Sequence, residues 1–337
     1  MTDTPRPSTV RQQPLLELRG VSRSFRMPRE GWRPGPMLRA LESVDLSIGP
    51  GEVLGLVGES GSGKSTLGRV ALRLIDPTAG RIEFEGQNIT AMRGAPLRAL
   101  RSRMQMVFQD PFASLNPRRR VGDAIDEVLA LHGMTDRTKR VARSAQLLEQ
   151  VGLSPDDRAR WPREFSGGQR QRIAIARALA VEPRLLVADE PVSALDVSIQ
   201  AGILALMREF QHRLNLAMLF ISHDLAVVEV MADRVMVLYL GRVMEVAPTR
   251  TLYSRPRHPY TAGLLAAAPR ADRMRQGAVQ LRDEIPSPIR PPSGCVFRTR
   301  CPFAQPRCAS EVPPLEDLGD GHFRACLRND LELVAPQ

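Results

Sequence analysis

The segment from residue 58 to residue 66 combines glycines, hydroxyls and one lysine in an order that can bind a chain of phosphates. It reads Gly58-Glu59-Ser60-Gly61-Ser62-Gly63-Lys64-Ser65-Thr66 and matches the pattern G-x-x-x-x-G-K-S/T. In this pattern the backbone amides curl around the phosphates, the lysine reaches the β- and γ-phosphates, and the first hydroxyl can bind Mg²⁺. The sequence therefore predicts a nucleotide-binding phosphate loop, which by itself leaves kinase, GTPase and ATPase open.

An acidic pair, Asp189 and Glu190, ends a short apolar run at residues 185–188. Parallel-sheet enzymes collect their catalytic groups at the carboxyl ends of such strands. We expect Asp189 to bind Mg²⁺, together with Ser65, and Glu190 to polarise the water that attacks the γ-phosphate. Such a general base contributes about 10²–10⁴ in rate.

Short elements must position these groups. Apolar runs of strand length indicate strands buried on both faces; they lie at residues 53–57, 185–188, 217–222 and 235–239. Two earlier strands are expected at 15–19 and 44–48, and a helix at 64–74, directly after the phosphate loop. Alternating strands and helices predict a mostly parallel sheet. Helical periodicity with charged faces between residues 110 and 164 predicts an inserted helical subdomain.

Composition sets outer bounds. The chain has 337 residues, 43% of them hydrophobic, which is enough for an ordinary globular core. It has neither a run of about 20 apolar residues nor the apolar stretch of a signal peptide, so we expect it in the cytoplasm. The formal charge of +10 fits nucleic acid, an anionic membrane surface or phosphorylated ligands, and so only shortens the list of partners.

A second glycine segment is the most specific motif. It reads Phe165-Ser166-Gly167-Gly168-Gln169-Arg170-Gln171-Arg172 and resembles the signature L-S-G-G-Q of the ABC transporter ATPases, with Phe in place of Leu. Taken alone, it could be a helix N-cap with a glycine turn. The resemblance implies an α/β P-loop NTPase fold: a RecA-like parallel sheet core, an antiparallel β subdomain, an inserted α-helical subdomain and a loop-rich C-terminal extension.

The same resemblance implies a shared ATP site. The signature residues Ser166, Gly167, Gly168 and Gln169 would bind the γ-phosphate of an ATP held by the phosphate loop of a second, similar subunit. One chain alone would then be nearly inactive.

Further site residues follow from the family resemblance. Gln109 resembles the glutamine that contacts Mg²⁺ and the attacking water, and His223 resembles the switch histidine that bonds the γ-phosphate. Asp196 lies in a segment that resembles the loop touching the partner subunit. Phe25 is the candidate for stacking on adenine, with Trp32 as a competitor. Standing alone, Gln109 would be an ordinary loop amide and His223 a strand-end histidine.

Three stretches narrow the resemblance to the second ATPase of the oligopeptide/dipeptide importers; they are 108–117, 189–200 and 258–261 continuing to 268–269. This implies residues 14–254 as the ATPase domain, with the helical subdomain at about 110–180, and residues 255–337 as the extension. It also implies a heterodimer with a similar ATPase, two transmembrane permease subunits contacted near 110–117, and an indirect link to an extracytoplasmic solute-binding protein. The location implied is the cytoplasmic face of the cell membrane.

All four cysteines, Cys295, Cys301, Cys308 and Cys326, lie in the extension. Their spacing lacks the tight C-x₂₋₄-C pair usual for structural zinc, and cytosolic disulfides are uncommon. Four thiolates could hold a 4Fe–4S cluster, which we favour, with zinc or metal-free reduced thiols as alternatives. His322 could substitute as a ligand, but we expect an exposed loop histidine.

Three other functions fit parts of the sequence. A soluble ABC ATPase acting on nucleic acid or ribosomes would suit the positive charge. The segment between Gln109 and the signature is too short for the long coiled coil of DNA-repair members, and the chain has one phosphate loop where ribosome-acting members usually have two. A P-loop kinase would have no use for the signature. A metal-regulated binding module would need a degraded Lys64 or Glu190, and both are intact. We therefore expect an ATP-hydrolysing importer subunit with no nucleic-acid partner.

Overall fold

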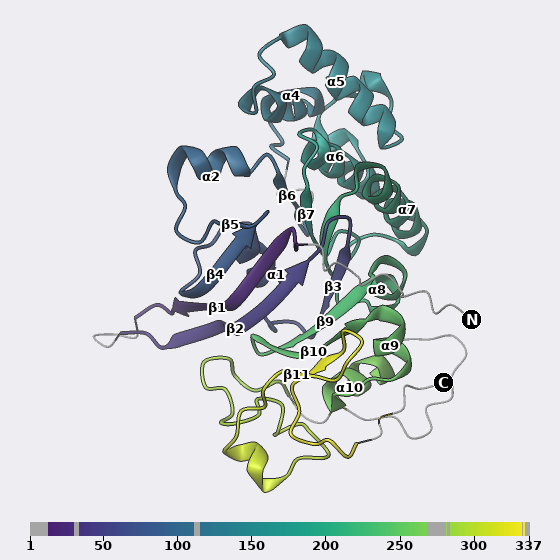
Figure 1. Ribbon diagram of the computed structural model, residues 1–337. Coiled ribbons are helices and arrows are strands. Elements are labelled where there is room, and N and C mark those ends of the chain that lie inside the picture. The colour runs from purple at the N-terminus through teal and green to yellow at the C-terminus, as the bar shows by residue number, and fades with distance from the viewer. Residues whose placement is uncertain are drawn as a thin grey trace, which may run out of the picture.

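The computed structural model describes residues 13–29, 34–110, 115–267, 281, 284–331 and 333, and it contains two β-sheets with helices around them (Figure 1). The larger sheet has the strand order β11-β12-β10-β9-β3-β8-β7-β6. Its strands are β3 (Val53–Val57), β6 (Met104–Val107), β7 (Leu185–Asp189), β8 (Ala217–Ile221), β9 (Arg234–Tyr239), β10 (Arg242–Pro248), β11 (Glu316–Asp317) and β12 (Phe323–Arg324). The five strands from β9 to β6 are parallel, and four of them, β3, β7, β8 and β9, coincide with the predicted apolar runs.

The smaller sheet is antiparallel, with the order β2-β1-β4-β5. Its strands are β1 (Leu16–Arg26), β2 (Met37–Ile48), β4 (Ala79–Phe84) and β5 (Gln87–Asn88). The first two strands are longer than the sequence patterns predicted, because the long β1–β2 ribbon continues to Arg26 paired with Met37. This sheet is the antiparallel subdomain that the family resemblance implied.

Helices cover both faces of the larger sheet. Around it lie α1 (Lys64–Ala71), α7 (Val197–Leu214), α8 (Leu225–Met231), α9 (Thr249–Ser254) and α10 (Pro259–Ala267). Strand β3 shows why both faces are apolar: Leu54 and Leu56 belong to one core with α1 and the smaller sheet, while Val53 and Val57 belong to the other core. Within the described residues, no helix has the length and apolar character required to cross a membrane.

The helical subdomain projects from one end of the sheet, at the top of Figure 1. It contains α4 (Val121–Leu131), α5 (Arg137–Gln150), the short 3₁₀ turns Pro155–Ala159 and Pro162–Glu164, and α6 (Gly167–Leu179); α2 (Gly94–Leu100) precedes it. Helix α5 begins where Asp136 caps it, accepting hydrogen bonds from the backbone amides of Thr138 and Lys139. Helices α4, α5 and α6 lie between β6 and β7 in the chain, so the predicted insertion between sheet strands is confirmed.

The C-terminal extension is joined to the ATPase core by strand pairing and by side-chain packing. Strand β12 pairs antiparallel with β10, so that Arg324 lies opposite Glu245. Tyr260, Phe297 and Cys295 belong to the same apolar core as the parallel strands. The hairpin β9–β10, which makes this edge available, turns through Leu240 and Gly241, both at positive φ.

A buried carboxylate fixes the junction. Glu245 is fully buried and accepts from the backbone amides of Arg257 (2.6 Å) and His258 (3.0 Å), and its carboxylate lies 2.7 Å from Nε2 of His322. The expectation of an exposed His322 is wrong: the β11–β12 hairpin folds onto β10 and leaves this residue only 6% exposed. His322 therefore bonds to Glu245 and serves the packing of the extension.

Candidate functional site

The phosphate loop connects β3 to α1 and closes around its own lysine. Gly63 has φ of 105°, and a Cβ there would come within 2.4 Å of the Ala40 carbonyl oxygen, so glycine is required. Lys64 Nζ donates to the carbonyl oxygens of Gly58 (2.7 Å) and Glu59 (2.9 Å). Burial lowers the pKa of the ammonium, while the acidic pair and Glu59 act to raise it.

The loop also offers unused donors, which fits it to phosphate. Helix α1 starts at Gly63 without a side-chain cap, so the amides of its first turn remain for a ligand. The buried hydroxyl of Ser62 has no hydrogen-bond partner in the part of the chain that the structure describes. Ser60 and Gly61 are exposed at the tip of the loop, and Thr66 lies in the first turn of α1. These features suit an anion with several oxygens.

The expected Mg²⁺ ligands lie side by side. Ser65 Oγ donates to Asp189 Oδ1 at 2.8 Å. Asp189 is 1% exposed at the end of β7, and burial raises its pKa, opposed by the Ser65 hydrogen bond and by the charges of Arg69 and Lys64. A hydroxyl and a carboxylate are hard oxygen ligands of the kind Mg²⁺ uses beside substrate phosphates. The residues present therefore fit the ion.

Gln109 and His223, which follow two strands of the sheet, both contact the carboxylate of Glu190, which follows a third. Glu190 follows β7 directly, and its Oε2 accepts from the Gln109 side-chain amide at 2.9 Å. Its other oxygen, Oε1, lies 3.2 Å from Nδ1 of His223, which follows β8. Gln109 follows β6, the outermost strand of the parallel set. Sequence order placed these residues far apart, and the parallel sheet assembles them.

The signature segment forms the start of α6, on the helical subdomain. Ser166 is the N-cap: its hydroxyl accepts from the amide of Gln169 at 3.3 Å, and Gln169 Oε1 accepts from the amide of Ser166 at 2.9 Å. A Cβ on Gly168 would meet Ile199 of α7 at 2.5 Å, so close helix packing requires that glycine. Ser166 is therefore a helix cap, as the motif taken alone predicted. At this helix N-terminus Ser166 is exposed and Gly167 is half-buried.

Two predicted nucleotide-site residues lie away from this group. Asp196 is exposed and caps α7 by position, without a side-chain hydrogen bond, next to Val197, which is 82% exposed. Phe25 lies near the end of β1, with the guanidinium of Arg23 over its ring at 4.4 Å. Arg23 therefore occupies one face of the ring on which adenine is predicted to stack. The competitor Trp32 lies outside the described residues, as do residues 111–114 of the predicted permease contact and the 268–269 stretch.

The four cysteine thiols are free, and ionisation of one of them would raise the pKa of its neighbours. Burial raises the pKa of Cys295 to about 11 and that of Cys301 to about 12, with further increases from the neighbouring thiols. Backbone amides donate to sulfur at Cys308 (3.5 Å) and at Cys326 (3.4 Å). The donor set fits an iron–sulfur cluster in kind, but no group of three or more Cys, His, Asp or Glu among the described residues is placed to hold a metal ion.

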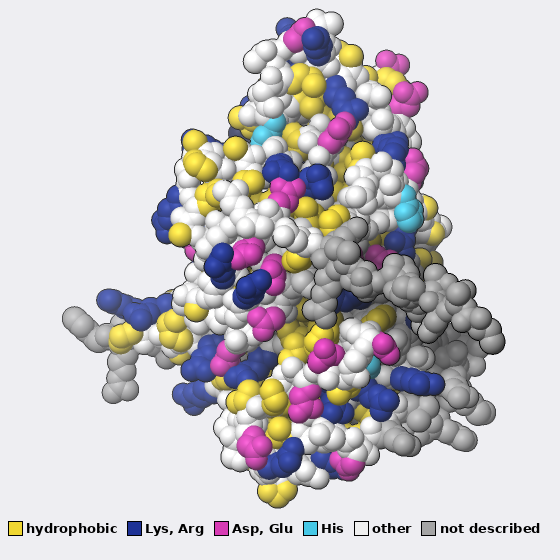
Figure 2. All heavy atoms as spheres, in the orientation of Figure 1, with side chains coloured by type: hydrophobic (Ala, Val, Ile, Leu, Met, Phe, Trp, Pro, Cys, Tyr) yellow, Lys and Arg dark blue, Asp and Glu magenta, His cyan; other side chains and the backbone are white. Residues whose placement is uncertain are grey.

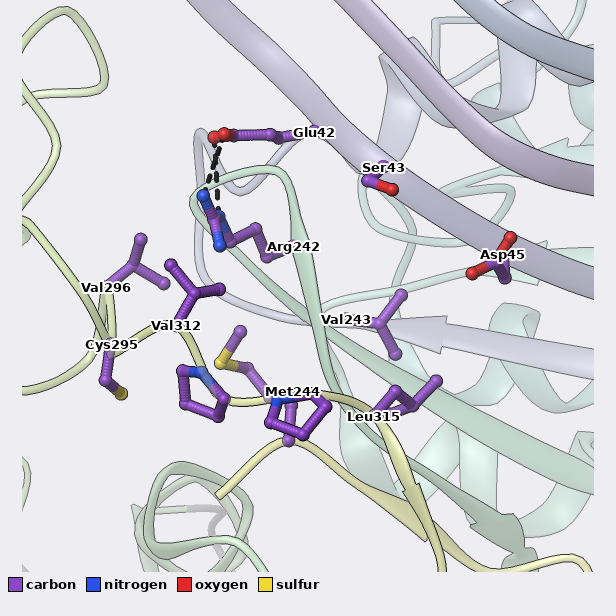
Figure 3. Close-up of a pocket in the computed structure, with 13 residues that line it drawn as sticks. Glu42, Ser43, Asp45, Arg242, Val243, Met244, Cys295, Val296, Val312 and Leu315 are labelled. Atoms are coloured by element: carbon purple, nitrogen blue, oxygen red, sulfur yellow. Dashed lines mark hydrogen bonds and ion pairs between the residues drawn. The ribbon is translucent and has the colours of Figure 1, made fainter. Parts of the chain in front are cut away.

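A cavity of about 240 Å³ lies between β2, β10 and the extension (Figure 3). Its walls include the Glu42–Arg242 ion pair (2.7 Å), Met244, Cys295 and Val312. None of its lining residues belongs to the phosphate loop. It is therefore distinct from the phosphate loop.

Two residues that touch the phosphate loop were missed as site residues by the sequence analysis. Tyr260 of α10 accepts from the amide of Glu59 at 2.9 Å, and Arg300 of the extension pairs with the Glu59 carboxylate. A carboxylate inside a phosphate-binding loop is a signal that a cation must lie nearby. The sequence gives no means of choosing that cation among so many arginines.

Comparisons with known proteins agree with this geometry. Residues 41–193 match the model of the ABC transporter family, and residues 244–308 match that of the oligopeptide/dipeptide transporter C-terminal region. The chain is 53% identical over 321 residues to a putative peptide import ATP-binding protein of Brucella ovis, covering 95% of this chain and 99% of the relative. It is 48% identical over 325 residues to the oligopeptide transport ATP-binding protein AppF of Bacillus subtilis, covering 95% and 98%.

A solved dimeric ATP-binding cassette, in a post-hydrolysis state with ADP and phosphate, matches with a TM-score of 0.63 and 28% identity, covering 70% of this chain and 99% of that one. The phosphate loop, the acidic pair and the signature all lie within the segment that matches the family model. The chain belongs to the ABC transporter family, among the ATP-binding subunits that carry the oligopeptide/dipeptide transporter C-terminal region.

Proposed function

We propose that this chain binds and hydrolyses ATP to power the import of peptides, or of a related small solute, through a membrane ABC transporter. The observation that carries the proposal is the Glu190 carboxylate, held by Gln109 and His223 beside the Ser65–Asp189 pair. The assignment to peptides draws on the relatives, which are described as peptide import and oligopeptide transport proteins.

The residues divide the chemistry among them. Lys64 and the amides of α1 bind and orient the phosphates, and Ser65 with Asp189 would hold Mg²⁺, which neutralises phosphate charge when bound. Glu190 accepts a proton of the attacking water, and Gln109 orients that water and the carboxylate. His223 can donate to the γ-phosphate while its ring remains beside Glu190.

A second ATPase subunit completes the site in this proposal. The exposed Ser166 and the N-terminus of α6 are on a different subdomain from Lys64, so their phosphate would be one held by the partner. The exposed Asp196 and Val197 would touch that partner. We infer that the partner is a similar but distinct ATPase, and that an ATP held between the two subunits closes them.

Association of the Glu190→Gln variant tests this mechanism. Removing the base preserves bound ATP, so the pair should accumulate, and light scattering would detect it. Stable pairing only with a similar ATPase subunit and ATP supports the heterodimer, and self-pairing would replace it with a homodimer. Lys64→Ala in the same background should abolish pairing. If no ATP-dependent pairing occurs, the shared-site mechanism is wrong.

The membrane partners are two transmembrane permease subunits, and an extracytoplasmic solute-binding protein acts through them. Residues 110–117, which follow Gln109 directly in the sequence, are the proposed contact, which would place the chain at the cytoplasmic face of the membrane. Replacing these residues with a Gly/Ser segment should abolish co-purification with the permease subunits while ATP binding persists. Unchanged co-purification would move the contact elsewhere.

We also infer that Cys295, Cys301, Cys308 and Cys326 hold a 4Fe–4S cluster. Support comes from four free thiols, three of them buried, and from backbone amides that donate to the sulfur of Cys308 and Cys326. Protein purified without oxygen should contain iron and acid-labile sulfide in equal amounts, and a Cys301→Ser variant should lose them. Stoichiometric zinc, or neither metal with four titratable thiols, would establish one of the two alternatives.

A further inference from the structure

The C-terminal extension reaches the nucleotide site through a side-chain pair that joins residues 241 positions apart. Arg300 Nη1 donates to Glu59 Oε2 at 2.5 Å, and Nη2 donates to Oε1 at 3.0 Å. The Arg300 side chain is 4% exposed and that of Glu59 is 22% exposed. A bidentate guanidinium–carboxylate pair of this kind fixes orientation as well as charge.

A second contact fixes the backbone of the same residue. The amide of Glu59 donates to the Tyr260 hydroxyl at 2.9 Å. Tyr260 is fully buried, and its ring packs against Tyr239 and Phe297 with centroids 4.7 and 5.2 Å away. Phe297 and Arg300 lie on one short segment, so the aromatic group and the ion pair form a single rigid support.

This support positions Lys64, the lysine of the phosphate loop, through Glu59. The Glu59 carbonyl is one of the two acceptors of the Lys64 ammonium, at 2.9 Å. Glu59 therefore has its amide held by α10, its carboxylate held by the extension, and its carbonyl bound to Lys64. A shift of this one residue would move the group that must meet the β- and γ-phosphates.

Charge gives the pair a second effect. The Glu59 carboxylate is close enough to act on the Lys64 ammonium, where it favours the charged form. Without a counter-charge, the same carboxylate would oppose the negative phosphates at that point. The bidentate contact with Arg300, whose side chain is 4% exposed, compensates the charge of the Glu59 carboxylate.

We propose that Arg300, with Tyr260, is a positioning residue for ATP: it orients Glu59 and neutralises it, so that ATP affinity depends on the C-terminal extension. The proposal rests on the proposed function, because it concerns the same ATP site. In this proposal neither residue binds the nucleotide itself. Their effect passes through the phosphate loop alone.

The test measures the Kd of the full-length chain for ATP-Mg²⁺ with a fluorescent ATP analogue. Arg300→Ala should raise Kd about fivefold or more, within the range of ordinary coupling between sites. Arg298→Ala is the matched control and should leave Kd unchanged, because Arg298 bonds to Ser293 of its own segment. The double variant Glu59→Gln with Arg300→Ala should bind like Glu59→Gln alone, since no uncompensated carboxylate remains.

A purely structural Arg300 gives a different result. In that case Arg300→Ala would lower the melting temperature with Kd unchanged, or the double variant would bind as weakly as Arg300→Ala, and either result overturns the proposal. If Arg300→Ala does not fold, the milder pair Arg300→Lys and Arg300→Gln decides: Kd should be higher for the uncharged Gln variant, and equal values overturn the proposal. Failure of the unaltered chain to bind ATP-Mg²⁺ would instead overturn the proposed function.

Discussion

The Gln109 side-chain amide donates at 2.9 Å to the Glu190 carboxylate, whose second oxygen lies 3.2 Å from His223 Nδ1. One carboxylate thus connects the ends of three strands, β6, β7 and β8. Glu190 adopts a left-handed backbone, with φ of 48°, a conformation that costs a non-glycine residue about 1–3 kcal/mol. The backbone amide of Glu190 donates to the carbonyl oxygen of Ile221 at 2.9 Å, which holds this residue at the end of β8.

Glu190→Gln should lower the turnover of the assembled ATPase about 10²–10⁴-fold while ATP binding persists, because the amide cannot accept a proton from water. Phosphate release measured at saturating ATP checks this. Glu209→Gln serves as a control, since Glu209 is exposed on α7. Turnover close to that of the unaltered protein would show that another group acts as the base.

His223→Ala should also lower turnover, because it removes the ring beside Glu190 and the donor proposed for the γ-phosphate. The expected loss is on the order of 10²-fold, in kcat more than in KM, since the ring acts on the reacting phosphate. His212→Ala, on the exposed side of α7, is the control. A rise confined to KM would contradict the assigned role and indicate simple nucleotide binding.

Glu245→Ala should destabilise the chain by about 1–3 kcal/mol, because it leaves buried backbone donors at Arg257 and His258 without an acceptor. Urea unfolding followed by circular dichroism measures the loss. Glu311→Ala, on the exposed part of the extension, should have little effect. If the two variants are equally stable, the Glu245 junction does not hold the extension in place.

Acid should destabilise the protein through His258. Burial, reinforced by the charge of Arg324, lowers the pKa of this imidazole from its ordinary 6.5 to about 3. The unfolded chain therefore binds a proton that the folded chain excludes between these two pH values. Stability is full above pH 6.5 and falls as the pH decreases toward 3, by about 1.4 kcal/mol per unit from this residue.

Urea midpoints at pH 7 and pH 5 for the unaltered protein and His258→Asn check this dependence. His258 Nδ1 accepts a hydrogen bond from the Tyr260 amide at 3.1 Å. Asparagine keeps an acceptor for this amide, but its side chain does not titrate. The variant should lose less stability between the two pH values than the unaltered protein. Equal losses would mean that carboxylates elsewhere dominate the acid response.

The surface charge has an arrangement that composition did not predict. On the face shown in Figure 2, many Lys and Arg side chains have Asp or Glu neighbours. The ion pairs of the structure include Arg119–Glu127 (2.7 Å) and Arg328–Asp330 (2.6 Å). Such pairs are worth little stability individually. They do break up the positive field that a net charge of +10 would otherwise suggest.

Sequence alone determined the features that reside in one contiguous segment. The phosphate loop, the acidic pair and the run of parallel strands follow from local spacing and periodicity, because backbone conformation and strand burial are set within a few residues. The helix cap at Ser166 could likewise be predicted from the sequence, because its partner Gln169 is only three residues away. The predicted strand at 53–57 coincides with β3.

Only the tertiary structure decided which distant residues meet. Arg300 pairs with Glu59 across 241 positions, and Tyr260 bonds the same residue across 201 positions. The burial of His322 on Glu245 joins residues 77 positions apart. Many arginines could satisfy a carboxylate equally well in the unfolded chain, so the choice depends on which strand the extension pairs with. That pairing, of β12 with β10, is a property of the folded sheet and has no local signature.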